Sequence, residues 1–167
     1  NGDSRRWVLK DPSHLWAPEA LLSTFPDACI VQMHRDPCEL IPSVASLVYT
    51  TRQMVEPDID KHRIGRRELA QWSGLLSNLA AFRHSHSSAP VYDVSMQELQ
   101  QDPAAVIKSI YRHFSLDQHR INFDSKIDSM IKGFKRDASH SHSKHHYTAE
   151  EFGLTDAIIK QAFTNKN

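Results

Sequence analysis

The sequence contains few of the residues that mark several large classes of protein. Among its 167 residues are five glycines and two cysteines, and aromatic side chains make up 8%. Two cysteines cannot build the set of disulfides that stabilises small secreted domains, so a reducing, cytoplasmic environment is expected. No apolar run reaches the roughly 18 residues that a membrane-spanning helix requires. The sequence therefore gives no indication of a disulfide-rich or membrane-spanning protein.

An excess of charge of one sign is also missing. The 20 lysines and arginines equal the 20 aspartates and glutamates. Such a chain has no overall electrostatic attraction to nucleic acid or to a membrane, so a site for an anion must arise from the local placement of charges. With 40% hydrophobic and 24% charged residues, residues 1–167 are predicted to form a single globular domain.

Short apolar runs alternate with a helical pattern in the first part of the chain. Residues 7–9 (WVL) predict a short strand, and residues 18–25 predict a helix because a proline starts it and apolar residues recur at helical spacing. Residues 28–33 (ACIVQM) predict a buried parallel strand. These three elements are therefore predicted to form a βαβ unit.

The rest of the sequence adds more helices than strands. Asp36 is placed to cap a helix that begins at Pro37, although Pro42 interrupts its hydrogen bonding. Apolar periodicity predicts further helices at 66–86, 103–115, 120–134 and 155–164, and a strand at 90–94. The predicted fold class is α/β with a parallel sheet, rich in helix.

Two residues near the second predicted strand are candidates for binding a phosphate. Ligands of open α/β sheets bind beyond the carboxyl ends of the strands. Arg35 follows this strand and offers a planar fork of donors, and Ser43 lies nearly two helical turns later, about 10 Å along the axis. Together with the helix N-terminus, they can hold one anion. Alternatively, Arg35 pairs with Asp36 or Glu39, and Ser43 has no role.

Lys10 and His14 follow the first predicted strand and form a second candidate pair. A lysine stabilises the charge that develops on a leaving group, and a neutral histidine removes a proton from an attacking hydroxyl. The competing interpretation is that both are solvated surface residues.

Taken in order, these residues resemble the sulfotransferase superfamily, and in particular its bacterial branch. The stretch WVLKDPSHLWAPEALLSTFPDACIVQMHRDPCELIPSVASL follows the pattern W-V-L-K-S-P-x-H-L … F-P-D-A-x-I-V-x-x-H-R-D-P … S-x-x-S-L. QELQQDPAAVIKSIYRHFSL is similar to Y-E-D-L-x-x-D-P … I-x-x-F-L/G-L, and HSKHHYTAEEFGL is similar to K-H-G-R-H-x-Y-S-x-x-x-F-G-L. The resemblance thus covers nearly the whole chain.

The resemblance implies a P-loop-like, three-layer α/β fold that transfers a sulfuryl group from 3′-phosphoadenosine 5′-phosphosulfate to a hydroxyl or an amine, without a metal. Arg35 and Ser43 match the family residues that hold the donor's 3′-phosphate. Lys144 falls on a basic position of the loop that closes over this phosphate. Lys10 matches a lysine near the 5′-phosphosulfate, and His14 matches a candidate general base.

Departures from the family pattern also matter. The glycine-rich turn P-R-S/T-G-T-T, whose backbone N–H groups cradle the 5′-phosphosulfate, is absent. The chain is therefore expected to be the C-terminal part of a longer domain, without the N-terminal strand, loop and helix, and to be inactive or strongly impaired alone. Met96 stands where the family often has a tyrosine near the adenine, and a methionine can pack on a purine. Ser143 and His146 replace a glycine and a basic residue in the closing loop.

Other functions compete with this prediction. A non-catalytic nucleotide-binding or interaction module of the same fold is favoured by the missing loop and opposed by the retained candidate residues. A nucleotide kinase is disfavoured because no G-K-S/T motif occurs. Histidines crowd residues 140–146 without the spacing typical of a metal site. The acceptor stays open between a small alcohol, a carbohydrate and a lipid.

Overall fold

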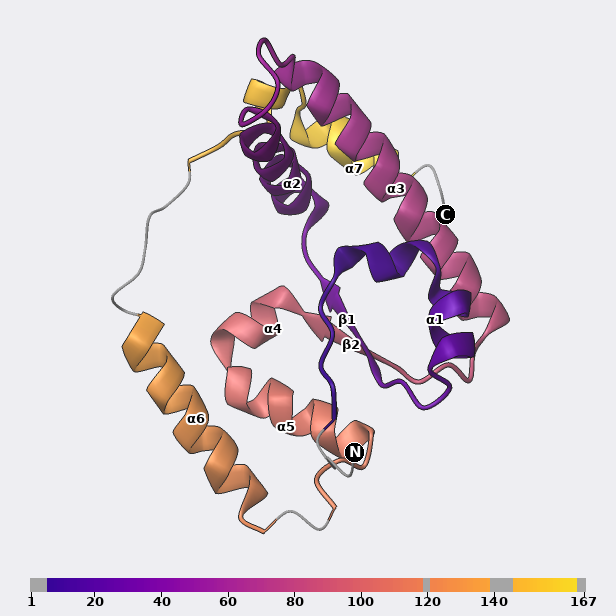
Figure 1. Ribbon diagram of the computed structural model, residues 1–167, viewed down its shortest axis with the longest axis vertical. Coiled ribbons are helices and arrows are strands. Elements are labelled where there is room, and N and C mark those ends of the chain that lie inside the picture. The colour runs from indigo at the N-terminus through magenta and orange to yellow at the C-terminus, as the bar shows by residue number, and fades with distance from the viewer. Residues whose placement is uncertain (1–5, 119–120, 139–145, 165–167) are drawn as a thin grey trace.

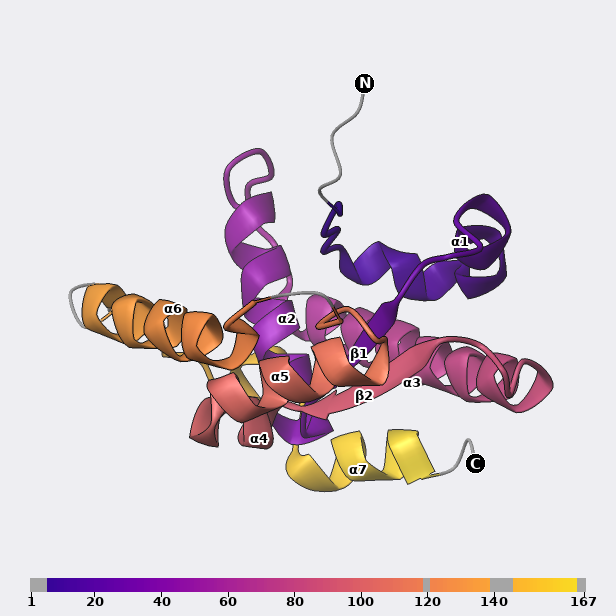
Figure 2. The same ribbon diagram turned by 90° about the horizontal axis from the view of Figure 1, so that it is seen from below.

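Two parallel strands lie at the centre of the molecule, and helices surround them (Figure 1). The computed structural model describes residues 6–118, 121–138 and 146–164. Strand β1 (Ile30–His34) pairs with β2 (Val91–Ser95), with Ile30 opposite Val91 and His34 opposite Ser95. Figure 2 shows α1 and α7 on opposite sides of the layer that contains these strands. The predicted class, a helix-rich α/β fold with an incomplete parallel sheet, is confirmed.

All of the predicted helices are present. In chain order the helical segments are η1 (Pro12–Trp16), α1 (Pro18–Thr24), α2 (Pro37–Arg52), α3 (Lys61–Ser85), α4 (Met96–Gln101), α5 (Pro103–His113), α6 (Phe123–Ala138), η2 (Glu150–Phe152) and α7 (Asp156–Thr164). Helix α3 begins earlier than predicted because the side chain of Asp60 caps it, accepting from the Arg63 N–H at 3.1 Å. Helix α4 was not predicted, since a segment this short shows no periodicity.

The strand predicted at residues 7–9 is not formed. Trp7, Val8 and Leu9 are 91%, 90% and 59% exposed, and they pair with no strand in the described part of the chain. A strand needs a neighbour for its N–H and C=O groups, and local apolar character does not supply one. The predicted βαβ unit is therefore replaced by the β1–β2 pair, which α2 and α3 connect.

Helix α2 begins where the sequence predicts. The Asp36 side chain accepts a hydrogen bond from the Cys38 N–H at 2.8 Å, and Pro37 occupies the first turn, where no N–H is needed. Pro42 lies inside the helix and is buried, and it has no N–H to give to the carbonyl of Cys38. Ile41 and Ala45 of the same helix are also buried, so this part of α2 packs into the core.

The core lies where α2 and α3 meet the C-terminal segment. One cluster joins Ile41, Leu69, Ala149, Leu154 and Ile159, and a second joins Ala45, Ile64 and Phe152. Helix α3 passes very close to η2 at Gly65, where an added Cβ would lie 2.2 Å from the Phe152 carbonyl oxygen. The segment 147–159 is thereby held against the start of α2.

Helices α5 and α6 pack against each other, and α5 also contacts α4 and β2. The rings of Tyr111 and Phe123 lie with centroids 5.0 Å apart, and Ile127 of α6 is buried. Figure 1 shows α6 at the edge of the molecule, beyond α4 and α5. In the described ranges, no helix is both long enough and apolar enough to cross a membrane.

Candidate functional site

The three polar residues at the end of β1 have three different partners. His34 Nε2 lies 2.6 Å from Asp93 Oδ1 on β2, and Arg35 Nε donates to Glu39 Oε2 at 3.2 Å. Asp36 caps α2. The carboxyl end of the strand is therefore tied to the neighbouring strand and to the helix that follows.

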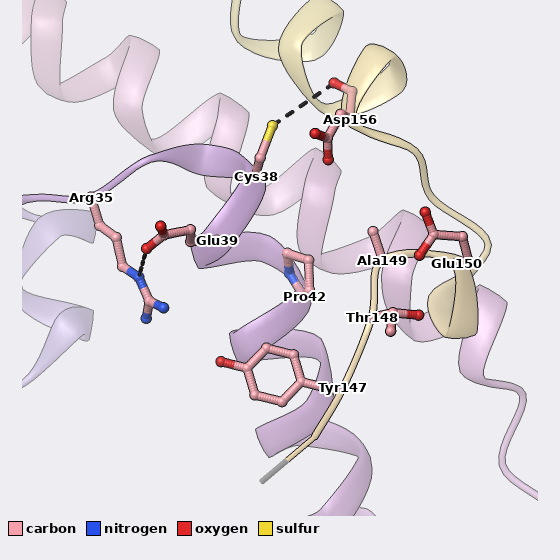
Figure 3. A pocket seen from close by; sticks show the side chains of 9 residues that line it. All are labelled: Arg35, Cys38, Glu39, Pro42, Tyr147, Thr148, Ala149, Glu150 and Asp156. Carbon is pink, nitrogen blue, oxygen red and sulfur yellow. Dashed lines mark hydrogen bonds and ion pairs between the residues drawn. The ribbon is translucent and has the colours of Figure 1, made fainter. Parts of the chain in front are cut away.

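A cavity of about 260 Å³ lies between the first turns of α2 and the chain that precedes and follows η2 (Figure 3). Figure 3 shows the side chains of Arg35 and Glu39 beside the start of α2, with the Tyr147 hydroxyl pointing to the same side as the guanidinium. The lining residues are Arg35, Cys38, Glu39, Pro42, Tyr147, Thr148, Ala149, Glu150 and Asp156. Two segments more than a hundred residues apart in the sequence thus form one site.

The electrostatics of this cavity are mixed. Among the residues named above, Arg35 carries the positive charge, whereas Glu39, Glu150 and Asp156 carry negative charges. The Arg35 side chain is 32% exposed and that of Glu39 is 65% exposed, so their ion pair is a surface pair of about 0.2–1 kcal/mol. An incoming phosphate can replace Glu39 on the guanidinium at this small cost.

Cys38 lies on the wall of the cavity as a free thiol. Burial raises its pKa above the ordinary value, and the nearby Asp156 and Asp36 carboxylates raise it further. Its Sγ lies 3.9 Å from the Asp156 carbonyl oxygen. The group is therefore a neutral hydrogen-bond donor and not a nucleophilic thiolate.

Of the other predicted phosphate and adenine ligands, those that the structure describes do not line this cavity. Ser43 is half-buried on α2, four residues after Glu39, and it is absent from the lining. Met96 is half-buried at the start of α4. A second cavity, of about 320 Å³, lies between β2, α4 and α5, and Met96 does not line it. Lys144 lies outside the described residues.

Lys10 and His14 lie at η1, and neither lines the cavity that contains Arg35. Lys10 is exposed, and His14 is half-buried. The turn is fixed by Asp11, whose side chain accepts from the Ser13 N–H at 2.8 Å, and this hydrogen bond lowers the pKa of Asp11. The structure thus places this pair on a different element from Arg35 and Ser43.

Sequence reasoning missed a polar network behind the end of β1. Arg83 of α3 donates to both oxygens of Asp93, at 2.6 and 2.7 Å, and also to Gln32 Oε1 at 3.1 Å. Hydrogen bonds from Arg83 and His34 lower the pKa of Asp93 from 3.8 to about 2. Tyr147 and Thr148 were also missed as lining residues, although the pattern that resembles the closing loop contains them.

Within the described ranges, no group of three or more histidine, cysteine, aspartate or glutamate side chains is arranged to hold a metal ion. The histidines at positions 140, 142 and 145 lie outside those ranges.

The chain has an α/β fold with a cavity where a parallel strand meets a helix. Comparison with known families identifies the family to which it belongs. The sequence profile of the sulfotransferase family matches residues 1–120. The chain belongs to this family.

Relatives with known names agree with this assignment. The omega-hydroxy-beta-dihydromenaquinone-9 sulfotransferase Stf3, from Mycobacterium bovis and from Mycobacterium tuberculosis, is 22% identical over 152 residues, which cover 89% of this chain and 38% of Stf3. The crystal structure of sulfotransferase STF1 from M. tuberculosis H37Rv matches with a TM-score of 0.74 and 34% identity over 96% of this chain. That of STF9 from Mycobacterium avium matches in fold, with a TM-score of 0.76 and 24% identity over 95% of this chain. The chain spans 40% of the length of each solved structure.

Proposed function

We propose that this chain provides the 3′-phosphate side of an enzyme that transfers a sulfuryl group from 3′-phosphoadenosine 5′-phosphosulfate to an acceptor hydroxyl. One observation carries the proposal. Arg35, from the segment that resembles the family's R-D-P motif, and Tyr147, from the segment that resembles its closing loop, line the same cavity. Membership of the sulfotransferase family supports the same reaction.

Arg35 and Ser43 are assigned to the donor's 3′-phosphate. The guanidinium exchanges Glu39 for the phosphate, and the N-terminal turn of α2 adds a favourable potential. Lys144, in the closing loop, contributes a further positive charge, and Met96 packs near the adenine. Because three carboxylates line the cavity beside one guanidinium, the described residues alone form a weak phosphate site.

Lys10 and His14 are assigned to the transfer itself. The acceptor oxygen attacks sulfur in line with the leaving phosphate, forming one S–O bond while the S–O bond to the 5′-phosphate breaks. His14 takes the acceptor proton, and Lys10 stabilises the charge that grows on the leaving phosphate oxygen. This scheme requires no metal.

The acceptor is proposed to be a hydroxyl on a lipid-like molecule. The relative Stf3 is named for a dihydromenaquinone that carries an omega-hydroxyl group. The exposed apolar residues Trp7, Val8 and Leu9 directly precede Lys10, so an apolar acceptor would meet compatible side chains next to the proposed reaction centre.

A non-catalytic nucleotide-binding module is the second candidate. The three carboxylates around Arg35 favour it. In this function the cavity binds a nucleotide, and no sulfuryl transfer follows.

Isothermal titration calorimetry with adenosine 3′,5′-bisphosphate tests the phosphate site. We expect weak binding that falls by about tenfold or more in Arg35→Ala, because a charge-assisted hydrogen bond is lost. Glu39→Gln, the matched control, removes the competing carboxylate and should strengthen binding by about two- to fivefold. Equal binding by Arg35→Ala and the unaltered chain would refute the assignment. Binding without sulfated product, for the chain joined to a complete family N-terminal segment, would favour the non-catalytic module.

A further inference from the structure

Glu151, in η2, joins the wall of the Arg35 cavity to the first turn of α3. One carboxylate oxygen, Oε1, accepts from the Thr148 N–H at 3.3 Å, and the Thr148 hydroxyl accepts from the Glu151 N–H at 3.4 Å. The other oxygen, Oε2, accepts from Lys61 Nζ at 2.9 Å. Thr148 lines the cavity, whereas Glu151 and Lys61 do not. A single carboxylate thus links a lining residue to a helix that lies outside the lining.

Lys61 is held by more than this carboxylate. Its Nζ lies 4.8 Å from the centroid of the Tyr49 ring and 5.9 Å from that of Phe152, and both rings attract a cation at this range. The two rings meet edge to face, with centroids 6.4 Å apart. The hydrogen bond to Glu151 raises the pKa of Lys61, so the ammonium stays charged at neutral pH. Side chains of α2, α3 and η2 therefore meet at one ammonium group.

The place of Lys61 in its own helix is electrostatically unfavourable. Lys61 is the first residue of α3, where the helix dipole gives a positive potential. The next residue, His62, lies against the same C-terminal segment, because an added Cβ at Gly153 would be 2.9 Å from the His62 Cγ. The partner on η2, rather than the helix, accounts for a lysine at this end.

Tyr147 depends on the same contacts. It packs against the buried cluster that contains Phe152, and its hydroxyl points to the side of the cavity where Arg35 lies (Figure 3). Tyr147 directly precedes Thr148, so the hydrogen bonds between Thr148 and Glu151 fix the backbone beside it. Loss of the Glu151 carboxylate therefore loosens the lining at Tyr147 without removing any lining side chain.

We propose that Glu151 and Lys61 are positioning residues of the donor site: their contact holds the lining residues 147–149 against α2 and thereby sets the affinity of the site for a nucleotide 3′-phosphate. The inference rests on the proposed function for the identity of the ligand, and on the contacts of Glu151 for the part that the two residues play. Without this contact, the lining occupies its present arrangement for a smaller fraction of the time, and the apparent affinity falls in proportion.

Hydrogen exchange of the full chain, followed by mass spectrometry, tests the contact without a ligand. Glu151→Ala removes both the ion pair and the hydrogen bonds to Thr148, so amides of residues 147–154 should exchange about fivefold faster. Lys61→Met should give a smaller increase. Lys61→Arg should exchange like the unaltered chain, because an arginine keeps the ion pair and the contact with the rings. Circular dichroism checks that each variant is folded.

Glu56→Gln is the matched control. It breaks the Arg52–Glu56 ion pair, whose side chains are 33% and 45% exposed, compared with 35% and 42% for Lys61 and Glu151. Neither Arg52 nor Glu56 lines the cavity. This variant should match the unaltered chain both in the exchange of residues 147–154 and in nucleotide binding.

Calorimetry with two nucleotides separates this inference from the proposed function. The unaltered chain should bind adenosine 3′,5′-bisphosphate more tightly than adenosine 5′-monophosphate. Glu151→Ala should weaken binding of the bisphosphate by about threefold or more, with little change for the monophosphate. No preference in the unaltered chain would overturn the proposed function, and the exchange of residues 147–154 would still decide whether the contact holds the lining. A preference that Glu151→Ala keeps in full, or exchange that it leaves unchanged, would overturn this inference alone.

Discussion

Asp93 accepts hydrogen bonds from two positively chargeable partners on different elements. The bidentate contact with Arg83 joins β2 to α3, and the contact with His34 joins β2 to the end of β1. These bonds stabilise the ionised carboxylate, which is why the pKa of Asp93 falls to about 2. The network thereby fixes the strand end from which Arg35 emerges.

Acid should weaken this network within a defined pH range. The pKa of Asp93 is lower in the folded chain than in the unfolded chain. The Asp93 carboxylate therefore stabilises the fold above pH 3.8, and this contribution is lost as the pH falls towards about 2. Arg83→Met should return the pKa of Asp93 towards 3.8 and flatten the pH dependence of the free energy of unfolding over this range. NMR titration of the carboxyl and urea unfolding at several pH values measure both effects. Arg112→Met removes another arginine–aspartate pair and should leave the titration of Asp93 unchanged.

At this scale, local motifs could be predicted from the sequence and distant pairs could not. Asp36 was identified as a cap because its partner is two residues away. The Arg35–Glu39 pair was weighed as an alternative because one helical turn separates the two residues. His34 and Asp93 lie 59 residues apart, and no pattern in the sequence connects them.

The close crossing of α3 and η2 gives a prediction at the level of elements. Gly65→Ala should lower the free energy of unfolding by about 1–3 kcal/mol, because its Cβ would lie 2.2 Å from the Phe152 carbonyl oxygen and force the two elements apart. Urea denaturation measures the change.

Gly133 supplies the control for this substitution. It also lies inside a helix, but an added Cβ meets nothing within 4 Å. Gly133→Ala should therefore stabilise the chain by about 0.5–1 kcal/mol, through helix propensity alone. A loss of stability in Gly133→Ala comparable to that in Gly65→Ala would show that the crossing is not the cause.

Helices were more predictable than strands for a physical reason. A helix forms its backbone hydrogen bonds within itself. Its ends are marked in the sequence by capping residues such as Asp36 and by prolines such as Pro103. A strand depends on a neighbour, so residues 7–9 have strand-like composition but form no strand and are exposed. The cavity also depended on long-range packing, because only the folded chain brings Tyr147 beside the start of α2.

At the scale of the whole molecule, the packing is uneven. The two core clusters draw their buried residues from α2, α3 and the segment 149–159. Of the apolar residues in the described part of α6, Ile127 is the one that is buried, and it is 9% exposed. The part of the molecule that holds the cavity is therefore packed more tightly than the part that holds α6.

Hydrogen exchange should report this difference. We expect amides of α6 to exchange through local opening, faster than amides in the middle of α3 around Leu75 and Leu79, which are 2% and 6% exposed. Mass spectrometry of exchanged peptides resolves the two helices. Equal protection of both would mean that α5 and α6 open only when the whole chain unfolds.

The pairing of Ile30 with Val91 also bears on how the chain folds. If the roughly sixty residues between the two strands were a random coil, closing this loop would cost about 3.6 kcal/mol of free energy through lost conformational entropy. Here that interval is largely α2 and α3, which pack against each other as an antiparallel pair (Figure 1). Once these two helices have formed and packed, they bring the chain back beside β1, and few backbone torsions between the strands remain free. Most of the entropy of closing the loop is therefore lost during helix formation and packing, before the strands pair.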